Sequence, residues 1–158
     1  MLDKRALIDE LLVRLRADRD VLVQAQRLSA EGVTHADAKS DGAKDMRSTE
    51  ASYIARGQAL RVEALEADIA KVAAMRPRAF GDGDAVAIGA VVEVEDEVGK
   101  RRVVFLAPAG GGEQLTDGIA VVTPKSPLGR ALIGARSGDV IELSRGGTID
   151  ELEIVELR

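Results

Sequence analysis

The sequence predicts an α+β protein in which an antiparallel helical hairpin precedes a small sheet domain. Two long segments, residues 3–31 and 45–75, contain no Pro and carry apolar residues at alternating spacings of three and four. This spacing is typical of helices that pack along one seam. A polar break with two Gly residues separates the segments, and after Pro77 the apolar period changes to two, as in strands.

Each predicted helix has one narrow apolar seam. The first seam comprises Ile8, Leu11, Leu15, Leu22, Ala25 and Ser29, and the second comprises Ala51, Ala55, Gln58, Val62, Leu65, Ile69 and Val72. Two seams of similar length joined by a short break predict an antiparallel hairpin, an arm about 45 Å long at ~1.5 Å per residue. Large apolar residues concentrate far from the break, so we expect a thin tip and a well-packed base.

The second half of the chain predicts a small sheet domain. Pro77 ends the second helix, and a Gly-Asp linker follows it. We therefore expect a hairpin domain over residues 1–76 and a sheet domain over 81–158. The expected strands cover 85–95, 101–106, 119–123, 140–143 and 149–155, and a short helix is expected over 128–133.

The composition excludes several classes of site. The chain has 158 residues, 46% of them hydrophobic and 31% charged, which is typical of a folded domain. It has no Cys, so disulfides and thiolate metal sites are excluded. Aromatic residues make up 2%, which disfavours an aromatic-lined pocket and base-stacking modules. No apolar run approaches ~20 residues, and no secretory signal opens the chain, so we expect a cytoplasmic protein without membrane contact.

Charge is distributed unevenly between the two halves. Residues 1–78 hold 14 Lys/Arg and 13 Asp/Glu, whereas residues 79–158 hold 8 and 14, and the net charge is −5. The negative charge of the protein repels the phosphates of nucleic acids, so we expect no independent nucleic-acid binding.

Known catalytic signatures are absent from the sequence. There is no nucleophile elbow, phosphate-binding loop or dinucleotide fingerprint. The one His, His35, lies in the polar break, and we interpret it as a solvated loop residue because a metal site needs convergent ligands.

The break is rich in carboxylates. Asp37, Asp41 and Asp45 follow one another at spacings of four, and Glu50 comes soon after. One interpretation is a solvated turn in which Asp41 or Asp45 caps a helix. The other is a site for a hard cation, since Mg²⁺ takes oxygen ligands and often only one or two protein carboxylates.

A resemblance to a known family comes from the C-terminal segment. The run Ser-Pro-Leu-Gly-Arg-Ala-Leu-Ile-Gly-Ala-Arg-Ser-Gly-Asp-Val over 126–140, followed by Glu-Leu-Glu-Ile-Val-Glu over 151–156, resembles the C-terminal domain of Gre-family transcript-cleavage factors. The resemblance implies an FKBP-like second domain that docks on RNA polymerase, with the hairpin inserted into the secondary channel. Ser126 and Pro127 match the docking loop; from the residues alone they are a helix N-cap and a Pro at the first helical position.

The tip departs from the family pattern. Cleavage-active members carry Gly-Asp-Leu-Ser-Glu-Asn-Ala-Glu-Tyr or a close variant, and this chain has Ser-Asp-Gly-Ala-Lys-Asp-Met-Arg-Ser-Thr-Glu-Ala-Ser-Tyr over 40–53. Glu50 and Tyr53 are retained. Asp41 fits the first acidic position, Lys44 falls at the second, and Asp45 is the substitute.

The resemblance implies a factor that stimulates cleavage of backtracked RNA by the polymerase and is not itself an enzyme. Asp41 and Asp45, helped by Asp37, would hold a Mg²⁺ ion shared with the polymerase active site. Lys44 and Arg47 would face phosphates of the nascent RNA, or else only balance local charge. The alternatives are a secondary-channel inhibitor without cleavage activity, a peptidyl-prolyl isomerase and a generic hairpin scaffold.

Overall fold

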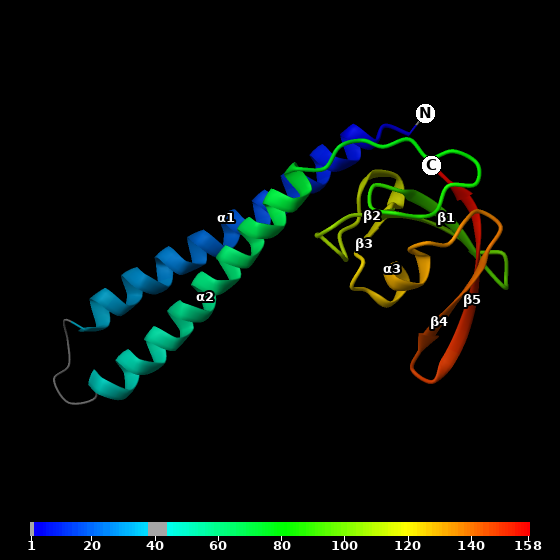
Figure 1. Cartoon of the computed structure of the whole chain (residues 1–158). Coiled ribbons are helices and arrows are strands. Elements are labelled where there is room, and N and C mark those ends of the chain that lie inside the picture. The colour runs from blue at the N-terminus through cyan, green and yellow to red at the C-terminus, as the bar shows by residue number, and fades with distance from the viewer. Residues whose placement is uncertain (1, 38–43) are drawn as a thin grey trace. The chain divides into compact units, whose positions relative to one another are not determined.

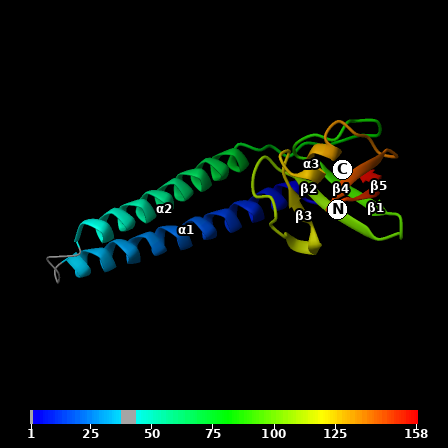
Figure 2. The same ribbon diagram turned by 90° about the horizontal axis from the view of Figure 1, so that it is seen from below.

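The computed structural model describes residues 2–37 and 44–158, with the side chains of 32–37, 44, 45 and 48 left out. Two helices form a hairpin-like pair and are followed by a sheet domain (Figures 1 and 2), so the predicted fold class is confirmed. The chain forms two compact units, one of Met1–Val13 with Ala70–Arg158 and one of Arg14–Ile69. The boundary between the units lies within α1 and α2. The boundary predicted from the sequence, between residues 76 and 81, lies instead where the helices end and the sheet domain begins.

Helix α1 spans Lys4–Asp37 and α2 spans Lys44–Ala73. The carboxylate of Asp3 caps α1 by accepting hydrogen bonds from the backbone N–H groups of Arg5 (2.9 Å) and Ala6 (3.3 Å). The polar break from Gly32 onward fits either a loop or the ends of the helices, and α1 continues past Gly32 to Asp37. A single Gly costs a helix only about 1 kcal/mol, which a long helix tolerates.

The hairpin is well packed at its base and thin farther along, as predicted. The buried apolar residues of the two helices all lie near the base, and Met75 just after α2 is buried there too; those in the helices are Leu7, Ile8, Leu11, Leu12, Leu15, Ile69 and Val72. No residue between 16 and 68 whose side chain the structure describes is buried. Ala25, Ser29 and Ala55 of the predicted seams are exposed, because side chains this small cover little surface. In this thin part, Arg19 of α1 pairs with Glu66 of α2 (Nη1–Oε1 3.2 Å).

The sheet domain contains one five-stranded sheet in the order β3-β2-β1-β5-β4. Its strands are β1 (Val91–Asp96), β2 (Arg101–Leu106), β3 (Ala120–Val122), β4 (Val140–Arg145) and β5 (Thr148–Leu157). All neighbours are antiparallel except β2 and β3, which are parallel. β3 and β4 are therefore the two edge strands.

The first predicted strand, 85–95, is only half correct. Strand β1 begins at Val91, and the residues before it pair with the segment after the short helix α3 (Pro127–Leu132). The N–H of Val86 donates to Ala135 O (2.8 Å), and the N–H of Gly134 donates to Val86 O (2.9 Å). Gly89 has φ +91°, a conformation that breaks an extended run and favours Gly.

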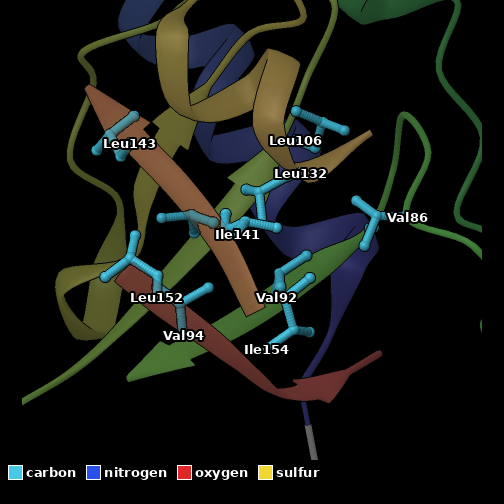
Figure 3. Close-up of a cluster of buried hydrophobic side chains, with 11 residues drawn as sticks. Val86, Val92, Val94, Leu106, Leu132, Ile141, Leu143, Leu152 and Ile154 are labelled. Carbon is cyan, nitrogen blue, oxygen red and sulfur yellow. The ribbon is translucent and has the colours of Figure 1, made fainter. Parts of the chain in front are cut away.

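The core of the domain lies between α3 and one face of the sheet. Leu132 of α3 is fully buried against residues from β1, β2, β4 and β5 (Figure 3). The cluster consists of Val86, Ala90, Val92, Val94, Val104, Leu106, Leu132, Ile141, Leu143, Leu152 and Ile154. At about 25 cal/mol per Å² of apolar surface, burying each such branched side chain contributes roughly 1.5–3 kcal/mol.

The start of α1 packs against loops of the sheet domain within the same compact unit. Both carboxylate oxygens of Glu10 accept from the N–H of Thr116 at 3.1 Å. The ammonium of Lys4 donates to Arg78 O (2.5 Å) and lies 4.5 Å from the centre of the Phe80 ring. The guanidinium of Arg78 lies 4.7 Å from the same ring. Burial, and secondarily repulsion from Arg78, lower the pKa of Lys4.

Candidate functional site

The segment that opens α3 forms a tight corner around Ser126. Its hydroxyl donates to Thr123 O (2.8 Å) and accepts from the N–H of Gly129 (3.0 Å). Ser126 is therefore the helix N-cap, as its sequence context predicts, and Pro127 takes the first helical position. The proline ring fixes the backbone angle φ and so makes the corner rigid. Its missing N–H costs no hydrogen bond, because the first N–H groups of a helix have no partner within the helix.

Gly129 allows the corner to close. A Cβ atom placed on Gly129 would lie 1.9 Å from Thr123 O, closer than any real contact. Only Gly lets the helix approach the preceding loop this closely. Sequence reasoning did not single out Gly129, and the available signal was a Gly inside a short helix that starts with Ser-Pro.

One side of the corner is buried and the other is exposed. Leu132 is buried and Leu128 packs against the same core, whereas Pro127 and Arg130 are exposed. Ile133 stays 45% exposed although it is apolar, and Lys125 just before the corner is exposed too. Of these exposed residues, the sequence analysis had named only Pro127.

The predicted tip residues lie almost entirely outside what the structure describes. Asp41 is outside the described residues, and the side chains of Asp37, Lys44, Asp45 and His35 are outside them as well. Their proposed roles stay predictions. Among the side chains that are described, no group of three or more His, Asp or Glu could hold a metal ion.

Of the tip residues expected to bind metal or RNA, Arg47 alone has a described side chain, and it is exposed on the first turn of α2. Farther along the same helix, Thr49, Ser52, Tyr53 and Arg56 line a surface depression. Tyr53, which matches the family's tip pattern, is 72% exposed. This part of α2 thus presents polar and aromatic groups to solvent and carries no buried core.

Within the described residues, no helix combines the length and apolar character needed to cross a bilayer.

The sheet domain that carries this corner matches a known protein family. Residues 81–158 match the family model described as "Transcription elongation factor, GreA/GreB, C-term". The chain belongs to the Gre family. Gre-family factors act with RNA polymerase rather than as independent enzymes, which favours the transcription interpretation over the isomerase and scaffold interpretations.

Relatives of two kinds are similar to this Gre-family chain. The transcription inhibitor protein Gfh1 of Thermus thermophilus is 24% identical over 94% of this chain and 91% of its own length. The transcription elongation factor GreA of Alkalilimnicola ehrlichii is 28% identical over 94% of this chain and 89% of its own length. A solved structure of the transcription factor Gfh1 aligns over 94% of both chains with 25% identity and a TM-score of 0.43.

Proposed function

We propose that this chain is a transcription elongation factor that binds RNA polymerase, inserts its hairpin into the secondary channel and stimulates cleavage of backtracked RNA. The observation that carries the proposal is the joining of a Gre-type C-terminal domain to a two-helix arm whose described distal part has no buried residue. Because this part of the arm buries no side chains, contact with the walls of a narrow channel would not disrupt any packed core. The protein would act wherever RNA polymerase acts, which places it in the cytoplasm.

The docking half of this function would depend on the corner around Ser126. The N-cap hydrogen bonds and the close approach of Gly129 fix the position of Pro127 before any partner arrives. A rigid contact loses little conformational entropy on binding, which favours affinity. Ser126 would hold the corner and Pro127 would touch the polymerase.

The catalytic half would depend on the tip carboxylates. Three Asp within nine residues supply the oxygen donors that Mg²⁺ prefers, so the donor set fits this ion. Asp41 and Asp45, with Asp37, would hold the ion together with groups of the polymerase. A Mg²⁺ ion bound there would make a coordinated water a better nucleophile. Lys44 and Arg47 would hold phosphates of the nascent RNA by charge-assisted contacts.

A second candidate is inhibition of the polymerase through the same channel without RNA cleavage. Two observations favour it. The chain is as widely covered by the transcription inhibitor protein Gfh1 as by GreA relatives, and Lys44 stands where cleavage-active members carry their second tip carboxylate. An ammonium at that place would reduce the affinity for a cation.

A transcript-cleavage assay on stalled, backtracked elongation complexes tests the proposal. The polymerase is incubated with and without this protein, and shortening of the labelled RNA is followed over time together with the elongation rate. Faster RNA shortening supports cleavage stimulation. Slower elongation without RNA shortening supports the inhibitor. No effect on either, with no binding to core polymerase, would refute both functions.

A further inference from the structure

A second apolar row runs along α2 on the side away from α1, its neighbour in the hairpin (Figure 1). Met46, Tyr53 and Leu60 follow one another at spacings of seven, and they are 85%, 72% and 59% exposed. At about 100° per residue, this row lies roughly opposite Ala51 and Gln58, which are half-buried in the seam of the hairpin. We call Met46, Tyr53 and Leu60 the outer row of α2. The hairpin leaves this row in solvent, although its spacing is that of a coiled-coil seam.

A depression beside the outer row also has coiled-coil spacing. It is the one lined by Thr49, Ser52, Tyr53 and Arg56, which stand at positions i, i+3, i+4 and i+7 of the helix. In a coiled coil, four residues of one helix form a hole, and an apolar side chain of the facing helix inserts into it. The exposed side of α2 therefore presents both parts of such a contact, the apolar side chains and a hole that can receive one.

Gly57 lies between Tyr53 and Leu60 on the same side of the helix, and the packing of a single chain does not require Gly there. A Cβ atom placed on Gly57 would meet no described atom within 4 Å. A Gly inside a helix costs about 0.5–1 kcal/mol relative to Ala. What a missing side chain does provide is room for another backbone to approach closely. Gly57 thus suits a second helix packed across the outer row.

The outer row is complementary to itself in an antiparallel pair of helices. In a two-fold dimer the same patch of each copy contacts the other, so each contact occurs twice. If Tyr53 of one copy lies opposite Leu60 of a second copy, the two-fold axis passes beside Gly57, where the backbones have room to approach. Leu60 of the second copy then lies over the centre of the depression. Each helix thus inserts an apolar side chain into the hole of the other.

Charged residues on one flank of the outer row match in this register. Glu50 and Arg61 are exposed and eleven residues apart, which places them on the same flank of α2. In the antiparallel pair, Glu50 of each copy lies within about 3 Å of Arg61 of the other along the helix axis, at ~1.5 Å per residue. Such flanking pairs of opposite charge determine the choice and orientation of coiled-coil partners. On the other flank, the Arg56 side chains of the two copies approach each other near the axis, and this repulsion weakens the pair.

We propose that the exposed side of α2 binds a second copy of this chain as an antiparallel helix pair. The contact surface consists of Met46, Glu50, Tyr53, Gly57, Leu60 and Arg61. Three large apolar side chains per copy bury much less than the ~1,600 Å² of a standard interface, so the dimer forms at micromolar concentrations or above and dissociates on dilution.

Self-association of this kind has a consequence for the arm. In the dimer each arm is covered by the other along much of α2, so dimer formation and entry into the secondary channel would exclude each other. High concentrations of the chain would then hold part of it in a form that cannot reach the polymerase active site. This consequence rests on the proposed function, whereas the dimer itself does not.

The test is sedimentation equilibrium of the full chain from micromolar to near-millimolar concentrations. Wild type should change from monomer to dimer over this range. Leu60→Gln should weaken the dimer roughly tenfold or more, because it removes the side chain that fills the hole. Val21→Gln is the matched control, since Val21 is 68% exposed on α1, and it should dimerise within about twofold of wild type. Gly57→Gln should also weaken the dimer while raising the urea midpoint of the monomer, because Gln is the better helix former.

A charge exchange tests the antiparallel register. Glu50→Arg alone places like charges opposite each other and should weaken the dimer roughly tenfold, and so should Arg61→Glu alone. Glu50→Arg together with Arg61→Glu restores opposite charges and should recover dimer formation to within about twofold of wild type. Failure of the double variant to recover would rule out this register.

The remaining outcomes separate this inference from the proposed function. A wild-type chain that stays monomeric at every concentration would overturn the inference, as would a dimer that Leu60→Gln and Gly57→Gln leave unchanged. If the chain is monomeric and Leu60→Gln instead weakens binding to RNA polymerase, the surface serves the polymerase, and only this inference fails. If the chain dimerises as expected but does not bind RNA polymerase, the proposed function fails and the dimer stands.

Discussion

Pro127 occupies the exposed first position of α3, where its ring is available to a partner and its missing N–H costs nothing. Replacing Pro127 with Gln should weaken polymerase binding by roughly 1–3 kcal/mol if the ring is a central contact. The fold should survive, because the Ser126 cap stays in place. Competition binding to core polymerase measures the effect; unchanged affinity with an intact circular dichroism spectrum would remove Pro127 from the interface.

Gly129 should tolerate no side chain. In Gly129→Ala the new Cβ would lie 1.9 Å from Thr123 O, so the helix or the loop must shift. Forcing extra atoms into a packed site costs typically 1–3 kcal/mol, and urea unfolding should show a loss of this size. Gly81→Ala is the matched control, because its Cβ would meet nothing closer than 3.9 Å. Equal stability of the two variants would mean that the corner is looser than described.

Lys4 should make stability depend on alkaline pH. Its pKa in the folded protein lies below the ordinary 10.5, so between these two values the unfolded chain binds more protons than the folded one. Stability therefore rises with pH across this window and is lowest, as far as Lys4 is concerned, where the ammonium is fully charged. The urea midpoint of wild type relative to Lys4→Met should increase with pH there. A difference that is constant with pH would show that burial of the ammonium has no net cost.

The same residues show how far a sequence determines a site. The N-cap role of Ser126 is visible in Ser-Pro before a short apolar run, because capping depends on neighbours in the chain. The loop before α3 folds back on the helix and brings Thr123 close to Gly129. The same fold leaves the side chains of Lys125 and Arg130 without a partner among the described residues. No local pattern encodes that fold.

At the scale of elements, the long periodic helices and the hairpin between β4 and β5 were predictable, because each depends on spacing or a Gly-Gly turn. The start of β1 was not. Ala85–Ala90 has the composition of a strand, but Val86 pairs with the backbone after α3, a tertiary contact. The end of α1 could not be fixed from the sequence, because Gly32 and the short polar residues after it fit either a loop or the last turns of a helix. The predicted tip site stays a prediction, since its carboxylates lie outside the described residues.

The hairpin tip yields a prediction of separable roles. Replacing Asp41 and Asp45 together with Asn should leave polymerase binding and the urea midpoint nearly unchanged, since surface substitutions usually stay within ~0.5 kcal/mol. Cleavage stimulation should be lost because amides bind Mg²⁺ more weakly than carboxylates. The measurement is RNA shortening in backtracked complexes across Mg²⁺ concentrations, with Glu63→Gln, an exposed site on α2, as the control.

Two results would redirect the tip hypothesis. Equal RNA cleavage by wild type and the double variant would rule out these carboxylates as the ion's ligands. Slowed elongation by both proteins without RNA shortening would establish the inhibitor in place of the cleavage factor. The isolated protein should bind Mg²⁺ only weakly in either case, because a few carboxylates leave most of the coordination shell to water.

At the scale of the whole chain, charge decides which partners are available. The excess of acid is confined to residues 79–158, and the first 78 residues are close to neutral. A chain of this kind gains little by releasing counterions from phosphates. Contact with nascent RNA through Lys44 and Arg47 would then depend on the polymerase, which brings the RNA and the tip together at high local concentration.

The protein should therefore show no useful affinity for free DNA or RNA at physiological salt, although it acts on RNA inside an elongation complex. Gel-shift titrations with single-stranded RNA and duplex DNA test this at 50 and 150 mM NaCl. Since each phosphate contact makes log K fall by about 0.7–0.9 per unit of log salt, a phosphate-driven binder would weaken steeply between the two conditions. Tight, salt-sensitive binding to naked RNA would mean that the basic side chains act without the polymerase. Binding only to assembled complexes, weakened in Pro127→Gln, would show that the acidic chain reaches RNA by way of a protein partner.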